Sequence, residues 1–489
     1  MKDSRIHYID GRWVPGLGEE FSSLNPATGE VIWTGRNGLD SEVAEAVTAA
    51  KQATADWGRR SVDERKEVLR SFAAAMKAER DRFARLISEE VGKPLWEART
   101  EVDAVVGKAD ASIEALEKRA TELRRTLGSV ESVTRFKAHG VVAVLAPFNF
   151  PMHMANGHIM PALLAGNTIV FKPSELAPKV AGEMVRIWEQ VGLPPGVLNL
   201  IQGDGRAGAC LVSHDGVAGV LFTGSRRVGV TINVALAQRP EKIVALEMGG
   251  NSPLVVWDYQ DVQAAVYVAI QSAFITTGQR CSAARRLIVQ EGDERFVDAL
   301  RRAATNLRAG AFDEDPEPYM GPLITEEAAQ SLLDLQDRLI KCGAEAVLRM
   351  ERPARTGAFV TPGLIDVTGT TNSERDAEFL GPLLQITRVR TFDQAIRACN
   401  DTDYGLAAGL VSGNEVLYHQ FLSEVTAGII NWNQQLTGAT AFAPFGGLKA
   451  SGNHRPSAYF AADYCSHAVA SMEVTTPIMP EKLPPGYSA

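Results

Sequence analysis

Five short apolar runs that recur along residues 140–256 constrain the fold more than any other feature of this sequence. They begin 22 to 29 residues apart with helical spacers between them, at residues 141–145, 168–171, 197–201, 219–222 and 243–246. Continuous apolar strands joined by helical crossovers form a parallel sheet that helices cover on both faces. The sequence therefore predicts an α/β fold that binds ligands at the carboxyl ends of these strands.

Polar and glycine-rich segments follow the predicted strands, where a ligand would lie. Residues 203–208 read Gly-Asp-Gly-Arg-Ala-Gly and fit the G-x-G-x-x-G dinucleotide pattern, but the next strand ends without the acidic residue that this pattern needs. Residues 224–229 form a second glycine-rich turn between a strand and a helix, whose free amides could face a phosphate. Either turn could equally be an ordinary strand-to-helix connection.

The segments on both sides of this region have different sequence patterns. Residues 1–35 predict short hairpins, and residues 40–123 predict helices, one of which starts with a capping box at Ser61. We interpret the many charges of that helical region as solvated helix faces. Residues 257 to about 450 again mix helices with apolar strands and predict a second α/β domain.

Composition excludes several classes of function. The formal net charge is −9 and no long run of Lys or Arg occurs, so nucleic acid is not an expected partner. The five cysteines lie far apart, which argues against a zinc site and a disulfide framework and favours a reducing compartment. No apolar run approaches the ~18 residues of a membrane helix. We therefore expect a cytoplasmic protein that binds neither metal nor membrane.

Cys281 is the best candidate for a nucleophile. It follows a Gly-Gln-Arg turn and precedes a strand-like run that starts at Arg286, a place where backbone amides and a cation could lower the pKa of the thiol. A cysteine in a chain of this kind is more often a small buried apolar residue. The rest of the sequence has to decide between these two interpretations.

The whole set of motifs, taken in order, resembles the aldehyde dehydrogenase superfamily along essentially the full chain. The matching segments are Pro147-Phe-Asn-Phe-Pro, Lys172-Pro-Ser-Glu, Phe222-Thr-Gly-Ser through Gly229, Glu247-Met-Gly-Gly-Asn-Ser-Pro, Gly278-Gln-Arg-Cys, Glu378 with Gly381-Pro382, Asn431-Trp-Asn, and Pro444-Phe-Gly-Gly-Leu-Lys-Ala-Ser-Gly. The resemblance implies two Rossmann-like α/β domains with parallel sheets and a small oligomerisation arm. It assigns NAD binding to residues 1–119 and 139–249, the catalytic domain to 250–467, and oligomerisation to 120–138 and 468–489 of a homodimer or homotetramer.

The resemblance also implies a mechanism. Cys281 would attack the carbon of a small-molecule aldehyde, and Asn149 with the Cys281 backbone amide would stabilise the charged oxygen. Hydride would leave to NAD, and Glu247 would activate water to hydrolyse the resulting thioester.

The same resemblance assigns the binding of NAD to specific residues. A carboxylate at position 175 would bond the free 2′-hydroxyl of the adenosine ribose and repel a 2′-phosphate, which favours NAD over NADP. One departure concerns Leu380, which stands where the family usually has an aromatic residue beside the nicotinamide, so we expect looser packing there. The residues assigned to the cofactor are Lys172, Glu175, Gly224, Ser225, Gly229, Glu378 and Phe148.

Within the superfamily the nearest similarity is to the enzymes that oxidise N-succinyl-L-glutamate 5-semialdehyde in arginine catabolism. The segments 156–167, 436–438 and 451–465 carry it. That substrate is a polyanion, so cations should line its entrance. The candidate substrate-binding residues are Arg280, His454, Arg455 and Gln434, although Gln434 stands where that group has a lysine, and Phe148 and Met152 would make the entrance more apolar.

Two alternatives stay open at this point. One keeps the mechanism and changes the substrate to another semialdehyde or to an aromatic aldehyde. The other is a non-catalytic structural relative, against which the presence of Cys281, Glu247 and Asn149 argues.

Overall fold

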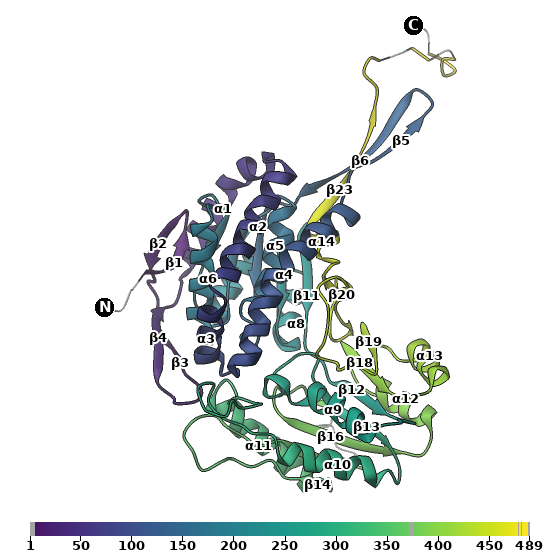
Figure 1. Cartoon of the computed structure of the whole chain (residues 1–489). Coiled ribbons are helices and arrows are strands. Elements are labelled where there is room, and N and C mark those ends of the chain that lie inside the picture. The colour runs from purple at the N-terminus through teal and green to yellow at the C-terminus, as the bar shows by residue number, and fades with distance from the viewer. Residues whose placement is uncertain (1–4, 371–375, 478, 481, 488–489) are drawn as a thin grey trace.

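Two seven-stranded sheets and a three-stranded arm organise residues 5–370, 376–477, 479–480 and 482–487, which the computed structural model describes. Figure 1 shows the N-terminal sheet and its helices stacked on the sheet of the C-terminal half, with the arm standing away from both. The predicted α/β fold class is confirmed. All five predicted strands form as well, as β7 (Val141–Leu145), β8 (Thr168–Lys172), β9 (Leu198–Leu200), β10 (Gly219–Thr223) and β11 (Ile243–Glu247).

The first sheet has the strand order β11-β10-β7-β8-β9-β1-β2. The five predicted strands pair in parallel, and β1 (Arg5–Ile9) adds to β9 in antiparallel orientation. From β7 the chain builds outward through β8 and β9, then returns to the other side of β7 to form β10 and β11. The order therefore reverses between β7 and β10, and such a switch point opens a crevice at the carboxyl ends of the strands.

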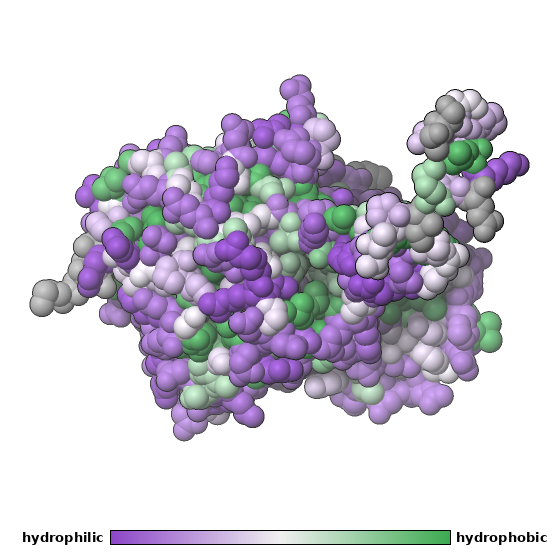
Figure 2. Space-filling model, turned by 90° about the horizontal axis from the view of Figure 1, so that it is seen from above, coloured by the Kyte–Doolittle hydropathy of each residue, from purple (hydrophilic) through white to green (hydrophobic). Residues whose placement is uncertain are grey.

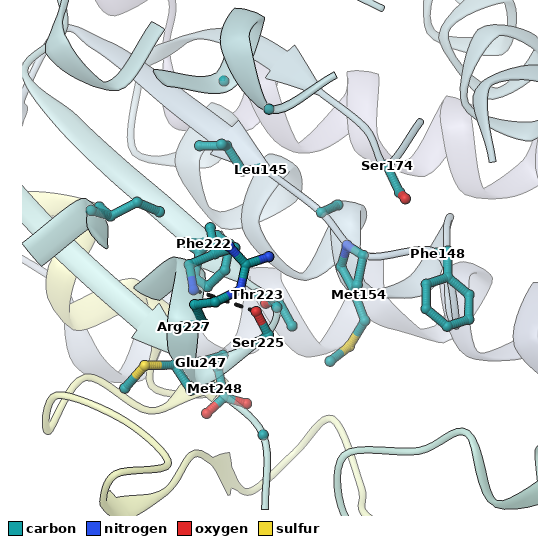
Figure 3. A pocket seen from close by; sticks show the side chains of 18 of the residues that line it. Leu145, Phe148, Met154, Ser174, Phe222, Thr223, Ser225, Arg227, Glu247 and Met248 are labelled. Atoms are coloured by element: carbon teal, nitrogen blue, oxygen red, sulfur yellow. Dashed lines mark hydrogen bonds between the residues drawn. The ribbon is translucent and has the colours of Figure 1, made fainter. Parts of the chain in front are cut away.

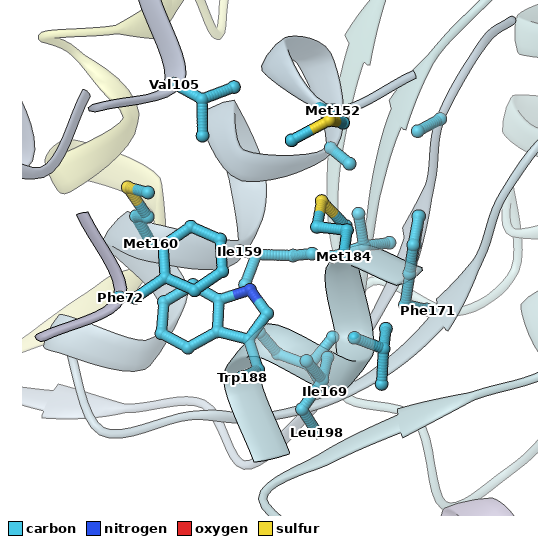
Figure 4. Close-up of a cluster of buried hydrophobic side chains, with 14 of the residues drawn as sticks. Phe72, Val105, Met152, Ile159, Met160, Ile169, Phe171, Met184, Trp188 and Leu198 are labelled. Atoms are coloured by element: carbon cyan, nitrogen blue, oxygen red, sulfur yellow. The ribbon is translucent and has the colours of Figure 1, made fainter. Parts of the chain in front are cut away.

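Helices cover both faces of this sheet because the side chains of each strand alternate between two cores. Val142 and Val144 point into a core formed with α2 (Val62–Ala78), α3 (Arg80–Val91), α4 (Leu95–Arg119), α5 (His153–Leu164) and α6 (Pro178–Gln190). At its centre Phe72 and Trp188 stack with ring centroids 3.7 Å apart (Figure 4). Val141 and Ala143 face the opposite core, formed with α1 (Asp40–Arg59), α7 (Gly205–Ser213) and α8 (Arg226–Ala235).

Local signals account for the start of α2 but not for the charges of α4. The Ser61 side chain accepts the Glu64 amide at 3.2 Å, and the Glu64 carboxylate accepts the Ser61 amide at 2.7 Å, so the predicted capping box is present. The interpretation of the charges in this region as solvated is wrong for part of α4. Glu97, Glu101 and Lys108 are buried on its inner face.

The second sheet has the order β14-β15-β16-β13-β12-β18-β19, parallel except at the β14 edge. Its strands are β12 (Ser252–Val256), β13 (Ala284–Gln290), β14 (Glu345–Leu348), β15 (Gly363–Asp366), β16 (Leu383–Val389), β18 (Ala407–Val411) and β19 (Ile429–Trp432). Its helices are α9 (Val262–Ala273), α10 (Glu294–Thr305), α11 (Glu326–Lys341), α12 (Phe392–Asn400) and α13 (Glu415–Glu424). The predicted α/β character of this half is confirmed.

The arm consists of β5 (Leu123–Leu127), β6 (Val130–Ala138) and β23 (Ser466–Glu473), so it pairs two segments that lie far apart in the sequence. The face seen in Figure 2 is mainly hydrophilic, with hydrophobic residues interspersed. Among the described residues no helix is long and apolar enough to span a bilayer. The remaining elements are β2 (Arg12–Pro15), β3 (Glu20–Leu24), β4 (Val31–Arg36), β17 (Tyr404–Gly405), β20 (Pro444–Phe445), β21 (Leu448–Lys449), β22 (Ser457–Ala458) and α14 (Ala461–Tyr464).

Candidate active site

The candidate site lies where the carboxyl edge of the first sheet faces the amino edge of the second. Glu247 ends β11, and the chain crosses directly to Ser252 at the start of β12. Asn149 follows β7, whereas Cys281 comes shortly before β13 and Glu378 shortly before β16. The first sheet therefore contributes residues that follow its strands, and the second contributes residues that precede them.

The turn before Cys281 is held in an unusual backbone conformation. It contains the short 3-10 helix η1 (Ile275–Gly278), in which Thr276 and Thr277 have φ angles of 56° and 54°. The buried carboxylate of Glu97 fixes this turn by accepting the Thr276 amide at 2.9 Å and the Thr276 hydroxyl. Gly278 has φ +69°, and a Cβ there would lie 2.2 Å from the carbonyl oxygen of Gly381, so only glycine fits.

Two cavities meet at Cys281. The larger has a volume of about 890 Å³ and runs along the carboxyl edge of the first sheet, from Lys172 to Glu378. The smaller, of about 280 Å³, lies between α4, α5 and the segment 437–442. Cys281, Met154 and Thr223 line both cavities, so the thiol stands at the junction between two spaces that could each hold a different molecule.

The pKa of the Cys281 thiol is raised to about 12, which is opposite to the direction that the sequence led us to expect. Burial is the largest cause, and the negative charge of Glu247 is the next. The expected cation is present as Arg285, and the Ser282 amide also favours the thiolate, but both effects are smaller than that of burial. The resting thiol is therefore protonated near neutral pH and needs a base to become nucleophilic.

Glu247 is positioned to be that base. Its side chain is 3% exposed, and its Oε1 atom has no hydrogen-bond partner among the described residues. Burial raises the pKa of Glu247 well above its usual range, and a hydrogen bond from the Gly447 backbone offsets only part of this effect. A buried carboxylate with a raised pKa, beside a thiol and a cavity, has the properties of a general base.

Asn149 lies on the same wall. Its Nδ2 atom donates a hydrogen bond of 2.8 Å to the backbone oxygen of Gln279, two residues before the thiol. One amide hydrogen remains for another acceptor. Asn149 and Cys281 both line the larger cavity, so the side chain of Asn149 borders the same space as the thiol.

Figure 3 shows side chains that line the larger cavity, among them Ser174, Phe222 and Ser225. Lys172 and Glu175 lie at one wall, with Nζ and Oε2 3.2 Å apart, and the Glu175 side chain is 47% exposed and can bond a ribose hydroxyl. The N-terminus of α8, capped by Ser225, opens at the same cavity and offers free amides to a phosphate. Between them lies an apolar wall made of Leu176, Ala209, Val212, Val228 and Ile232.

Not every predicted cofactor residue lines this cavity. Gly224 and Ser225 do, whereas Gly229 lies one helical turn away and packs against Met248, where a Cβ would come within 2.4 Å of the sulfur atom. Gly205 and Gly208 of the first glycine-rich turn also line the cavity. Arg227 does too, and nothing in its local sequence singled it out.

Glu378 and Phe148 line the larger cavity as well. The Glu378 carboxylate lies directly on Gly249, where a Cβ would overlap its Oε1 atom. Burial raises the pKa of Glu378, and the Arg285 guanidinium opposes that shift. Leu380 lines the cavity, and Phe379 lines it too, so an aromatic residue is present one position earlier than in the motif.

The structure places the predicted substrate-binding residues in different environments. Arg280 lines the smaller cavity, but its donors are used by Glu97 at 3.0 Å, by Thr276 Oγ1 at 2.7 Å and by the Thr437 backbone oxygen at 2.9 Å. Met152, which was expected at the entrance, is fully buried in the core instead (Figure 4). The remaining three candidates are exposed and do not line either cavity: His454, Arg455 and Gln434.

Comparisons with known proteins agree with this geometry. Residues 13–469 match the aldehyde dehydrogenase family. Two proteins named N-succinylglutamate 5-semialdehyde dehydrogenase are each 50% identical to the chain: the one from Pseudomonas fluorescens over 98% of both chains, and the one from Ectopseudomonas mendocina over 99% of both.

Solved structures give the same result. Betaine aldehyde dehydrogenase from Staphylococcus aureus in complex with NAD+ superposes with a TM-score of 0.92 at 28% identity, over 97% of this chain and 96% of that one. An aldehyde dehydrogenase from Bacillus cereus superposes with a TM-score of 0.91 at 30% identity, over 96% of each chain.

Proposed function

The chain belongs to the aldehyde dehydrogenase family, and on that premise we propose that it oxidises N-succinyl-L-glutamate 5-semialdehyde to N-succinyl-L-glutamate with NAD, as a step of arginine catabolism. The observation that carries the chemistry is the position of Cys281 at the junction of the two cavities. The names of the relatives that match over nearly the whole chain support the choice of substrate.

In the proposed mechanism the aldehyde occupies the smaller cavity and its carbon reaches the sulfur of Cys281. Glu247 takes the thiol proton, and Asn149 donates a hydrogen bond to the oxygen of the thiohemiacetal. After the hydride has left, the carbon and sulfur form a thioester. Glu247, having passed the thiol proton to solvent, then removes a proton from water, which attacks the thioester carbon. The acid leaves, and the proton on Glu247 returns to the Cys281 sulfur to restore the thiol.

The larger cavity would hold NAD through Lys172 and Glu175 at the ribose, Ser225 with the α8 N-terminus at the phosphates, and Glu378 near the nicotinamide end. Bound there, NAD supplies the hydride acceptor. The exposed Glu175 carboxylate favours a free ribose 2′-hydroxyl over a phosphate. Glu247 also favours hydrolysis over transfer of the acyl group to coenzyme A, because it provides a base for water.

The experiment that tests the function is a substrate profile. We expect kcat/KM for N-succinylglutamate 5-semialdehyde to exceed that for other semialdehydes and for aromatic aldehydes, with the free acid as product whether or not coenzyme A is present. A preference for an uncharged aromatic aldehyde would overturn the substrate. NADH formation by a Cys281→Ala variant at the wild-type rate would overturn the mechanism.

The organisation of the chain is part of the proposal. Residues 1–119 and 139–249 would bind the cofactor, 250–467 would carry the nucleophile, and 120–138 with 468–489 would join subunits into a homodimer or homotetramer. The arm supports this, because it extends from the body and its side chains at Leu123, Leu127 and Met472 are exposed. The five free cysteines are consistent with a reducing, cytoplasmic setting.

A further inference from the structure

The charged side chains that line the smaller cavity are Glu101, Lys108 and Arg280. Two of them have buried partners of opposite charge. Glu101 accepts the ammonium of Lys93 at 2.6 Å and the backbone amides of Met152 and His153 at 3.1 and 3.2 Å. Arg280 pairs with Glu97, and the ring of Phe150 lies beneath both Arg280 and Lys93. These pairs neutralise one another and leave no charge for a ligand.

Lys108 is the exception. It lies in the middle of α4, is 5% exposed, and has neither a hydrogen bond nor an ion pair within the described part of the chain. The imidazoles of His153 and His158 supply no countercharge, because a histidine side chain is either neutral or positive. Burial and the Lys108 charge lower the pKa of both, which keeps them neutral. The cluster around this cavity therefore holds the cations Lys93, Lys108 and Arg280 against two carboxylates, and the unmatched charge is that of Lys108.

The space beside the Lys108 ammonium is open. Gly157 on the facing helix α5 has no side chain, and a Cβ placed there would lie 3.9 Å from Nζ, with no other atom within 4 Å apart from those of its own helix. A Cβ on Gly107, next to Lys108, would also meet nothing within 4 Å. A buried ammonium without a partner is costly, so a cation kept beside free space in a cavity fits an anion that arrives from solvent.

We propose that Lys108 determines the substrate specificity of this site by binding a carboxylate of the aldehyde substrate in the space that Gly157 leaves open. The inference rests on the proposed function, because it assigns the smaller cavity to the aldehyde. N-succinylglutamate semialdehyde carries one carboxylate on its succinyl arm and one on its α-carbon, both remote from the aldehyde group. Phe150, Met154 and Phe445 line the same cavity and give its walls an apolar character that suits the methylene groups between those ends.

The test compares Lys108→Met and Lys108→Arg with the wild-type enzyme. The matched control is Lys118→Met, which makes the same change on the same helix at a side chain that is 64% exposed and paired with Glu114. Each protein is assayed with N-succinylglutamate 5-semialdehyde and with hexanal, which has no charge. We expect Lys108→Met to lower kcat/KM roughly 100-fold for the dicarboxylate and less than about threefold for hexanal. Lys108→Arg should recover part of the loss, and Lys118→Met should behave as the wild type.

Gly157→Leu provides a second variant that leaves the lysine in place. It should fill the space beside the ammonium and produce the same selective loss, so the inference stays testable even where Lys108→Met fails to fold. Equal losses for both aldehydes in both variants would overturn the inference, because they would indicate a purely structural role.

The wild-type profile separates this inference from the proposed function. A preference for a different anionic aldehyde, with a selective loss in Lys108→Met, would refute the named substrate and support the role of Lys108. A preference for uncharged aldehydes would overturn both.

Discussion

The two cavities that meet at Cys281 are built in different ways. The larger one is lined at the ends of the strands of the first sheet, by residues that stand in short contiguous motifs such as those at Lys172 and Ser225. The smaller one is lined by side chains from the inner faces of α4 and α5 and from the distant segment 437–442. The lining of the first therefore depends on where the strands end, and the lining of the second depends on which side chains face inward from its helices. Under the proposed function, the larger cavity would hold the cofactor and the smaller one would select the aldehyde.

The largest effect is expected where the two cavities join. A Cys281→Ser variant should lose roughly 10⁴-fold or more in kcat, because a hydroxyl is a much weaker nucleophile than a thiol and no second nucleophile takes part in the mechanism. Steady-state NADH formation measures the loss. Binding of NADH, followed by fluorescence titration, is the control and should be unchanged, since the larger cavity is left intact. Activity near the wild-type level would remove Cys281 from the mechanism.

A substitution of Glu247 tests the step in which water attacks the thioester. A Glu247→Gln variant should lose roughly 10³-fold in steady-state rate, because the thioester then lacks a base for hydrolysis. Rapid mixing should show no burst of NADH, because Glu247 is also the base that takes the thiol proton. A full burst in the variant would show that another group activates the thiol.

The pH dependence has a definite sign. Burial raises the pKa of Glu247, so the wild-type rate should fall as the pH drops through that raised value, where the carboxylate becomes protonated and can no longer accept a proton. The Glu247→Gln variant should lose this dependence. An unchanged profile in the variant would assign the titration to another group.

The contrast between the cavities also explains what the sequence could predict. The five strands follow from apolar runs whose side chains are buried on both faces, and polar residues after those strands must meet at one edge of the sheet. Asn149, Lys172 and Glu247 are found there for that reason. Direct inspection could not foresee that the Cys281 pKa is raised, since the shift depends on burial and on the distant Glu247.

The smaller cavity could not be predicted in this way. On α4 the spacing of Glu97, Glu101 and Lys108 is compatible with a polar face, and only the tertiary structure reveals that this face turns inward toward α5 and the Cys281 turn. His454 and Arg455 were chosen because a polyanionic substrate needs cations, but they are exposed on a loop outside both cavities. The position of a charged residue in the sequence does not by itself show whether its side chain will be buried or exposed.

The buried charge of Lys108 should also affect the stability of the folded chain. Burial lowers the pKa of Lys108 from 10.5 to about 8, so the unfolded chain binds more protons than the folded one between these two values. The contribution to the free energy of unfolding therefore rises with pH through this window, by about 3 kcal/mol at most. Lys108→Met should raise the thermal midpoint at pH 7 and should flatten the pH dependence between pH 8 and 10.5 relative to the wild type.

The control for this prediction is again Lys118→Met, which should follow the wild-type stability profile because its ammonium lies in solvent. A lower midpoint for Lys108→Met at pH 7 would contradict the idea that Lys108 is kept at a cost to stability.

The smallest effect is expected at the ribose end of the larger cavity. Glu175 is about half exposed and pairs with Lys172, so solvent screens much of its repulsion toward a 2′-phosphate. Glu175→Gln should therefore shift the ratio of kcat/KM for NAD over NADP by only about tenfold, toward NADP, with little change in the KM for the aldehyde. Initial rates with both nucleotides measure the shift. Equal use of the two nucleotides by the wild type would show that Glu175 does not discriminate. A large change in the aldehyde KM would show that binding in one cavity is coupled to binding in the other.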